Sequence, residues 1–265
     1  MGYLCFEGVF ELLGKLETGK KKWIVVMIVC AIIFALTLFF ALKWWLGGPT
    51  DTSEYKQETS SLSAVSEIEY VDNPIDFAAL QAENPDVCGW ITLPETKIDY
   101  PILQSSVEDD NFYLDHDLNK KKSVYGAIYI QRLNSNRFTD PNTVIYGHNM
   151  KNGTMFQNLH KFRNKDFFDA NEYFYIYTPG HIYTYRIFAA YRSDNRHILN
   201  SNDFTDKQSY AEYIESVKNP QSLMKNTREV DITTDDRIVT LSTCISDERY
   251  RYLVQGVLIK DELTK

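Results

Sequence analysis

Residues 238–245, Ile-Val-Thr-Leu-Ser-Thr-Cys-Ile, form a run in which β-branched and apolar residues dominate. Such a run is typical of a strand that lies half or wholly buried in a sheet. Cys244 stands at its far end, and a charged stretch at residues 246–251 separates it from a second apolar run at residues 252–259. A thiol at the mouth of a strand, with arginines a few residues on, is placed like a nucleophile beside a cation.

A similar run lies upstream at residues 143–146 and ends in Gly147-His148-Asn149. A thiol with a pKa of roughly 8.5 is a poor nucleophile at neutral pH until a neighbouring cation lowers that pKa. His148 can supply the cation and later pass a proton to a leaving amine. Arg251 keeps its charge, so its N–H groups can hold the oxyanion of a tetrahedral intermediate or position a substrate. We therefore expect Cys244, His148 and Arg251 to meet in one cleft and to carry out acyl transfer.

Each of these three residues has a simpler interpretation when it is taken alone. A single strand cysteine is more often an inert buried residue, and a histidine after a glycine is more often part of a turn. Arg249 competes for the cationic role, and Arg251 is preferred because it directly precedes the second apolar run. Asp247 or Glu248 could orient His148, and the sequence does not decide between them.

The N-terminal part of the chain has the pattern of a membrane anchor. Residues 23–42 carry no charge over 20 positions, and a helix of that length spans roughly 30 Å of hydrocarbon. Three lysines at residues 20–22 precede it, which predicts that the N-terminus stays in the cytosol. We expect the following organisation: a cytosolic tail at residues 1–22, a transmembrane anchor from Trp23 to Leu46, an extracellular linker at residues 47–72 and a catalytic domain at residues 73–265. A cleaved signal peptide is the competing interpretation, although the apolar run is longer than such peptides usually have.

Charge and cysteine content narrow the class of protein. The chain has a formal net charge of −8, and residues 47–265 carry 23 Lys and Arg against 33 Asp and Glu, which argues against nucleic acid as a partner. Of the four cysteines, only Cys88 and Cys244 fall in the expected extracellular part. A Cys88–Cys244 disulfide is therefore an open alternative. Such a bridge would leave no free thiol, and the chain would then be a non-enzymatic surface ectodomain.

The rest of the chain reads as short strands with a few helices. We expect helices at residues 75–81, 155–162 and 204–217, the last capped by Asp203 or Thr205, with Tyr210, Tyr213, Ile214 and Val217 on one face. Short connections between the strands favour a closed or nearly closed β-barrel, so the fold class is mainly β. The eight expected strands are residues 87–93, 98–103, 126–130, 143–146, 173–178, 183–191, 238–243 and 252–260.

Competing kinds of site have little support. The five histidines show no His-x-x-x-His spacing and the cysteines no Cys-x-x-Cys spacing, so a zinc site is not indicated. The chain also lacks a Gly-x-Ser-x-Gly elbow, a P-loop and a Gly-x-Gly-x-x-Gly motif. We expect neither a metal nor a cofactor.

Three motifs in this order resemble the sortase family, the membrane-anchored cysteine transpeptidases of Gram-positive bacteria. They are Thr240-Leu241-Ser242-Thr243-Cys244, Tyr146-Gly147-His148-Asn149-Met150 and Arg251-Tyr252-Leu253-Val254. The resemblance extends over about residues 76–260. The helix ahead of the barrel and the helix-bearing insertion at residues 192–237 are similar to class B of that family.

The resemblance implies an eight-stranded sortase barrel in which the insertion forms one wall of the substrate groove. It implies that the Cys244 thiolate attacks the carbonyl of a Thr in a C-terminal sorting signal, and that an amine on a peptidoglycan precursor resolves the acyl-enzyme. His148 would be the acid and base, Arg251 the oxyanion or positioning group, and Ser242 and Thr243 would touch the substrate. A pilin-polymerising sortase, whose acceptor is a Lys side chain, stays open as an alternative.

Overall fold

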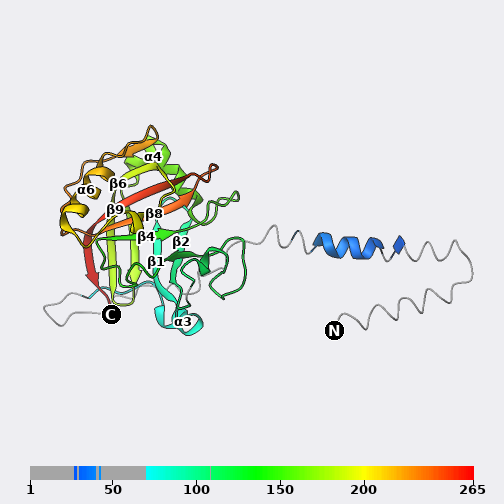
Figure 1. The fold of residues 1–265 in the computed structure, drawn as a ribbon. Coiled ribbons are helices and arrows are strands. Elements are labelled where there is room, and N and C mark those ends of the chain that lie inside the picture. Colours follow the sequence, from blue (N-terminus) through cyan, green and yellow to red (C-terminus); the bar gives the residue numbers. More distant parts are fainter. Residues whose placement is uncertain (1–26, 29, 40–41, 43–69, 108) are drawn as a thin grey trace, which may run out of the picture. The chain divides into compact units, whose positions relative to one another are not determined.

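The computed structural model describes residues 27–28, 30–39, 42, 70–107 and 109–265, and the chain divides into two compact units, residues 1–47 and residues 48–265. In the first unit the described residues are helical (Figure 1). Within the described part of the chain, no helix is both long enough and apolar enough to cross a membrane. Most of the expected anchor at residues 23–46, the tail at residues 1–22 and the linker up to residue 69 lie outside the described residues.

In the second unit, eight strands close into a barrel, as expected from the sequence. Around the barrel they follow the order β5 (Tyr173–Thr178), β1 (Val87–Leu93), β2 (Ile98–Gln104), β3 (Ile128–Ile130), β4 (Asn142–Tyr146), β8 (Ile238–Cys244), β9 (Tyr250–Leu263) and β6 (His181–Asp194). Neighbours in this order are paired, and the pairing of β6 with β5 closes the ring. A ninth strand, β7 (Lys225–Thr227), adds to the edge of β6; its sequence, Lys-Asn-Thr, carries no apolar signal, and the prediction missed it.

The barrel register brings the three sequence motifs to one place. β4 and β8 run parallel with Tyr146 beside Ser242, and β8 and β9 run antiparallel with Cys244 opposite Arg251. His148 follows the end of β4 by two residues. The end of β4, which is far upstream in the sequence, therefore meets the end of β8 and the start of β9 at one end of the barrel.

Apolar side chains from the inward faces of the strands fill the barrel. Ile91, Ile145, Leu241 and Val254 belong to this core and are fully buried. Gly256 on β9 is needed for the close approach of Phe174, because a Cβ atom at Gly256 would lie 2.5 Å from the Phe174 ring. A second cluster packs under the insertion and a third under the first helix of this unit.

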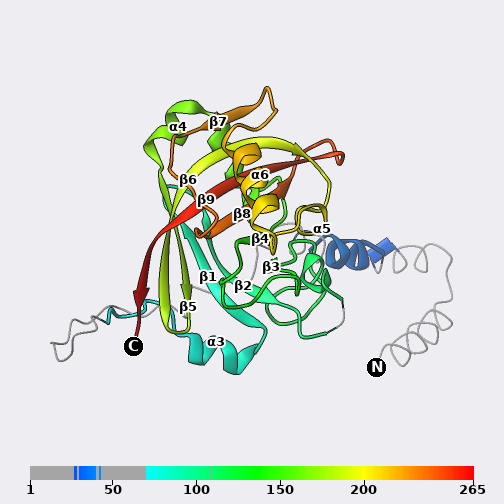
Figure 2. The same cartoon turned by 60° about the vertical axis from the view of Figure 1, so that its left-hand side comes forward.

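The helices differ in their limits from the sequence predictions. α3 (Phe77–Glu83) begins two residues later than expected, because Asp76 caps it by accepting the Ala79 N–H. The segment expected at residues 155–162 is a 3-10 helix, η3 (Phe156–Arg163), and α4 (Lys165–Ala170) follows it without having been predicted. α3 and α4 lie at opposite ends of the barrel in both views (Figures 1 and 2).

The insertion between β6 and β8 contains α5 (Ile198–Ser201), which was not predicted, and α6 (Lys207–Lys218). The expected caps of α6 were wrong. Asp206 caps the helix by accepting the Ser209 N–H, whereas Asp203 accepts from Thr205 in the turn before it. The predicted inner face of α6 is correct: Tyr210, Tyr213, Ile214 and Val217 are its buried residues.

Candidate active site

Cys244 is the last residue of β8 and lines a groove of 270 Å³. Its thiol is free and partly exposed. All five residues that the sequence motifs put forward lie in the lining of this groove, together with one tyrosine each from β3 and β4: Tyr129, Tyr146, His148, Ser242, Thr243, Cys244 and Arg251. The structure thus brings together nucleophile, imidazole and guanidinium from three separate strand ends.

His148 is positioned through the backbone of the residue before it. The Gly147 N–H donates to the Ser242 carbonyl at 3.1 Å, and the Thr243 hydroxyl donates to the Gly147 carbonyl at 2.8 Å. Gly147 has no room for a side chain, since a Cβ atom there would lie 2.5 Å from Ile128 and 2.7 Å from Phe156. The histidine is therefore carried on a backbone that is bonded directly to the cysteine strand.

The contact with Leu114 identifies which nitrogen of the His148 ring carries a hydrogen. Its Nε2 lies 2.6 Å from the carbonyl oxygen of Leu114. A carbonyl oxygen only accepts, so Nε2 carries the hydrogen, and Nδ1 is left as the acceptor when the ring is neutral. Such a ring can take up a proton at Nδ1 and give it back.

Arg251 is held by main-chain oxygens and not by a carboxylate. Its Nη1 donates to the carbonyls of Glu248 at 3.2 Å and of Tyr250 at 3.1 Å. Among the described residues it forms no ion pair, so its positive charge acts on the groove. Burial raises the pKa of Tyr129 and Tyr146, and the Arg251 charge opposes that rise at both phenols, while a Cys244 thiolate adds to it at Tyr129.

Arg249, the rival of Arg251, points to a different partner. Its guanidinium forms a two-pronged contact with the Asp247 carboxylate, at 2.9 Å from Nε and 2.7 Å from Nη2. These hydrogen bonds hold the pKa of Asp247 at about 2. Arg249 is absent from the lining of the Cys244 groove. The Asp247 carboxylate is thus engaged by Arg249, and the contact that orients His148 comes from Leu114 instead of Asp247 or Glu248.

Ser242 and Thr243 lie in the groove but are deeply buried, at 4% and 1% exposure. The Thr243 hydroxyl is used in the bond to Gly147 described above. The Thr243 side chain therefore holds the backbone next to His148.

A polar network in the groove was missed by the sequence predictions. Asn111 Oδ1 accepts from the Tyr129 hydroxyl at 3.2 Å and from Gln131 Nε2 at 3.0 Å. Gln131 Oε1 in turn lies 2.7 Å from Nε2 of His197, the residue that caps α5. Through His197 and Gln131 the network links the insertion to the end of β3, in the same groove as the Cys244 thiol. Asn111 and His197 stand away from the strand ends, and Gln131, although it directly follows β3, belongs to none of the three sequence motifs.

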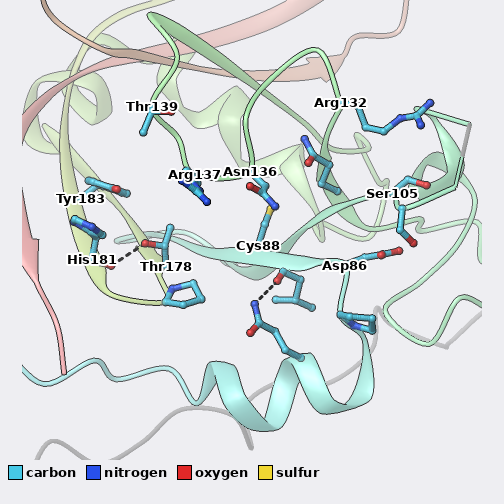
Figure 3. Close-up of a pocket in the computed structure, with 16 residues that line it drawn as sticks. Asp86, Cys88, Ser105, Arg132, Asn136, Arg137, Thr139, Thr178, His181 and Tyr183 are labelled. Atoms are coloured by element: carbon cyan, nitrogen blue, oxygen red, sulfur yellow. Dashed lines mark hydrogen bonds between the residues drawn. The ribbon is translucent and has the colours of Figure 1, made fainter.

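The other cysteine of the barrel unit, Cys88, lies in a separate cavity of 630 Å³ (Figure 3). Its thiol is free and buried, and it donates to the Ile102 carbonyl at 3.4 Å. Because Cys88 and Cys244 are both free thiols and line different cavities, the alternative of a Cys88–Cys244 disulfide is wrong. Among the described residues, no group of three or more His, Cys, Asp or Glu is arranged to hold a metal ion.

Known proteins resemble this chain in both sequence and structure. A family model described as the sortase domain matches residues 91–259. The chain is 39% identical over 183 residues to sortase B of Listeria monocytogenes, covering 68% of this chain and 72% of that protein. Its structure is similar to sortase B of Clostridium perfringens, with a TM-score of 0.62, 36% identity and coverage of 69% of this chain and 99% of the other. It is also similar to a Staphylococcus aureus sortase B–substrate complex, with a TM-score of 0.63, 29% identity and coverage of 70% and 85%.

Proposed function

Because this chain belongs to the sortase family, and within it to class B, we propose that it is a cysteine transpeptidase that attaches surface proteins to peptidoglycan. Its substrate is a C-terminal sorting signal, cleaved after a Thr through a thioacyl intermediate on Cys244. The acceptor is an amine of a peptidoglycan precursor. The observation that carries the proposal is the shared groove of Cys244, His148 and Arg251, in which Cys244 lies directly opposite Arg251.

In the first step the Cys244 thiol passes its proton to Nδ1 of His148, the resulting thiolate attacks the carbonyl carbon of the substrate Thr, and a carbon–sulfur bond forms. The negative charge that develops on the carbonyl oxygen is stabilised by the Arg251 guanidinium. His148 donates a proton to the leaving nitrogen as the peptide C–N bond breaks. The products are a thioester on Cys244 and the released C-terminal peptide.

In the second step the acceptor amine attacks the thioester carbonyl. His148 removes a proton from the attacking nitrogen, and the carbon–sulfur bond breaks to restore the thiolate. Ser242 and Thr243 contribute to the wall that the peptide meets. Binding of a sorting-signal peptide is supported by the relative from Staphylococcus aureus, which was solved in a sortase B–substrate complex.

We also propose that the chain is anchored in the membrane. Residues 23–46 anchor the chain, with residues 1–22 in the cytosol, residues 47–72 as a linker and residues 73–265 as the catalytic domain outside. The charge-free run at residues 23–42 and the three lysines before it support this organisation. In cell fractionation, we expect the full chain in the membrane pellet and a chain without residues 1–46 in the soluble fraction. A full chain that stays soluble would contradict the anchor.

The activity is tested with a library of sorting-signal peptides and the purified domain of residues 47–265, with and without an amine acceptor. We expect cleavage after Thr, and a new peptide–amine product when the acceptor is present. Cleavage of none of the peptides by a folded domain would overturn the proposal.

A further inference from the structure

A second histidine, His160, contacts the candidate nucleophile from outside the groove. It lies in the last turn of η3, and its Nε2 is 3.2 Å from the carbonyl oxygen of Cys244. Since a carbonyl oxygen only accepts, Nε2 carries the hydrogen and donates it. The contact is made to the backbone of Cys244, so His160 acts on the residue that carries the sulfur and not on the sulfur itself.

The surroundings of His160 keep the ring in this one protonation pattern. Its Nδ1 is buried and has no hydrogen-bond partner among the described residues, so a proton added there would find no acceptor. The ring lies 5.2 Å from the ring of Tyr252, and the Arg163 guanidinium covers the same tyrosine at 5.1 Å. Burial, together with the Arg163 charge, lowers the pKa of His160 to about 4. The neutral imidazole therefore offers a single donor, directed at the Cys244 carbonyl.

The carbonyl that His160 contacts belongs to Cys244, the last residue of β8. The ladder between β8 and β9 ends at the pair Cys244 and Arg251. Beyond it the chain enters the connecting loop, where Ser246, Glu248 and Arg249 are exposed. The His160 bond thus fixes the peptide at the point where the strand stops and the loop starts.

The same 3-10 helix also holds the histidine of the groove. The Phe156 N–H, in the first turn of η3, donates to the His148 carbonyl at 2.9 Å. η3 packs against both β8 and β9. One short helix is therefore bonded to the main chain of His148 at its start and to the main chain of Cys244 near its end.

We propose that His160 is a positioning residue for the transpeptidation, whose Nε2–H fixes the Cys244 peptide so that η3 sets the geometry between the thiol and His148. The inference rests on the proposed function in one respect, namely that Cys244 is the nucleophile. His160 supplies no proton to the reaction. Its effect is on the orientation of the Cys244 side chain, and misplaced reacting groups slow a reaction strongly.

The test compares two substitutions in the full chain. His160→Gln keeps an N–H donor near the position of Nε2, whereas His160→Phe keeps a ring and removes the donor. We expect His160→Phe to slow single-turnover acylation by a sorting-signal peptide about tenfold with KM within about twofold of the native value, and His160→Gln to retain most of the rate. The acid limb of the pH–rate profile should not move in either variant. Equal losses in the two variants, or a native rate in His160→Phe, would overturn the proposal.

A second measurement needs no substrate and separates this inference from the proposed function. Amide hydrogen exchange of the segment 244–251 should be faster in His160→Phe and close to native in His160→Gln, with both variants unfolding at temperatures near that of the native chain. Unchanged exchange in His160→Phe would contradict the role of the contact. If the native chain forms no acyl-enzyme while exchange responds as expected, the positioning contact stands and the assigned reaction falls.

Discussion

The barrel holds two free thiols in two cavities, and only one of them has the surroundings of a nucleophile. Cys244 is partly exposed, shares its groove with His148, and lies opposite an arginine that has no carboxylate partner in the described part of the chain. Cys88 is 6% exposed, and burial raises the pKa of its thiol to about 12, with a small further contribution from Asp86.

The Cys88 cavity also contains a histidine, yet the arrangement differs. His181 is engaged by the Asp261 carboxylate at 2.7 Å and lies with Tyr183 at one side of the cavity, away from Cys88 (Figure 3). A cysteine and a histidine in one cavity are therefore not sufficient for nucleophilic catalysis. Three features distinguish the Cys244 groove: its thiol is accessible, its arginine is held by main-chain oxygens with no carboxylate partner among the described residues, and the strand that precedes His148 ends beside the cysteine strand.

The largest expected effect comes from replacing each of the two cysteines by alanine in turn. Cys244→Ala should reduce cleavage of a sorting-signal peptide by at least about 10³-fold, because no nucleophile remains to form the acyl-enzyme. Cys88→Ala is the matched control and should keep the native rate. Cleavage assays with both purified variants check this, and a larger loss in Cys88→Ala would reverse the assignment of the two cavities.

The next effect separates the two arginines beside Cys244. Arg251→Ala should lose on the order of 10²-fold in kcat/KM, since it removes the charge that faces the developing oxyanion. Arg249→Ala should stay within about twofold, because Arg249 is paired with Asp247 and lies outside the lining of the groove. If Arg249→Ala were the worse variant, the oxyanion role would pass to Arg249.

The reactivity of the two thiols toward a small reagent gives a third test. At pH 7 a methanethiosulfonate reagent should modify Cys244 and leave Cys88 free, since a buried thiol with a pKa of about 12 is neutral at that pH. Peptide mapping by mass spectrometry identifies the modified residue. Equal labelling of both cysteines in the folded chain would show that the burial of Cys88 does not protect it.

The smallest effect is a pH dependence of stability that belongs to Cys88. Its folded-state pKa lies above the unfolded value of 9.0, so the protonated thiol stabilises the folded state fully below pH 9 and this contribution is lost between pH 9 and about 12. At pH 10.5 the loss is about 2 kcal/mol. Urea unfolding of the native chain and of Cys88→Ala at pH 8 and pH 10.5 measures it, and a stability difference independent of pH would contradict the raised pKa.

Much of the barrel could be predicted from the sequence because each strand buries a run of apolar residues. β7, with the sequence Lys-Asn-Thr, has no such run, and its pairing with β6 comes from tertiary structure alone. α4 and α5 are too short to show a helical period. The capping error at α6 arose because Asp203, Thr205 and Asp206 are all good caps, and only the fold selects among them.

The site was predictable where a residue stands at the end of a strand. Cys244, His148 and Arg251 do, and they line one groove. Asn111 and His197 do not: they reach the groove through the loop before η2 (Phe112–Leu114) and through the insertion, so their meeting depends on the closed topology. His160 is a similar case, because a 3-10 helix and not a strand brings it to Cys244.

The most direct test of the account is the site of the acyl-enzyme. The native chain is incubated with a sorting-signal peptide, quenched in acid, and mapped by mass spectrometry. We expect a thioester between the N-terminal fragment of the peptide and Cys244, and none on Cys88. A thioester on Cys88, or peptide cleavage by a Cys244→Ala chain at the native rate, would contradict the assignment of Cys244 as the nucleophile.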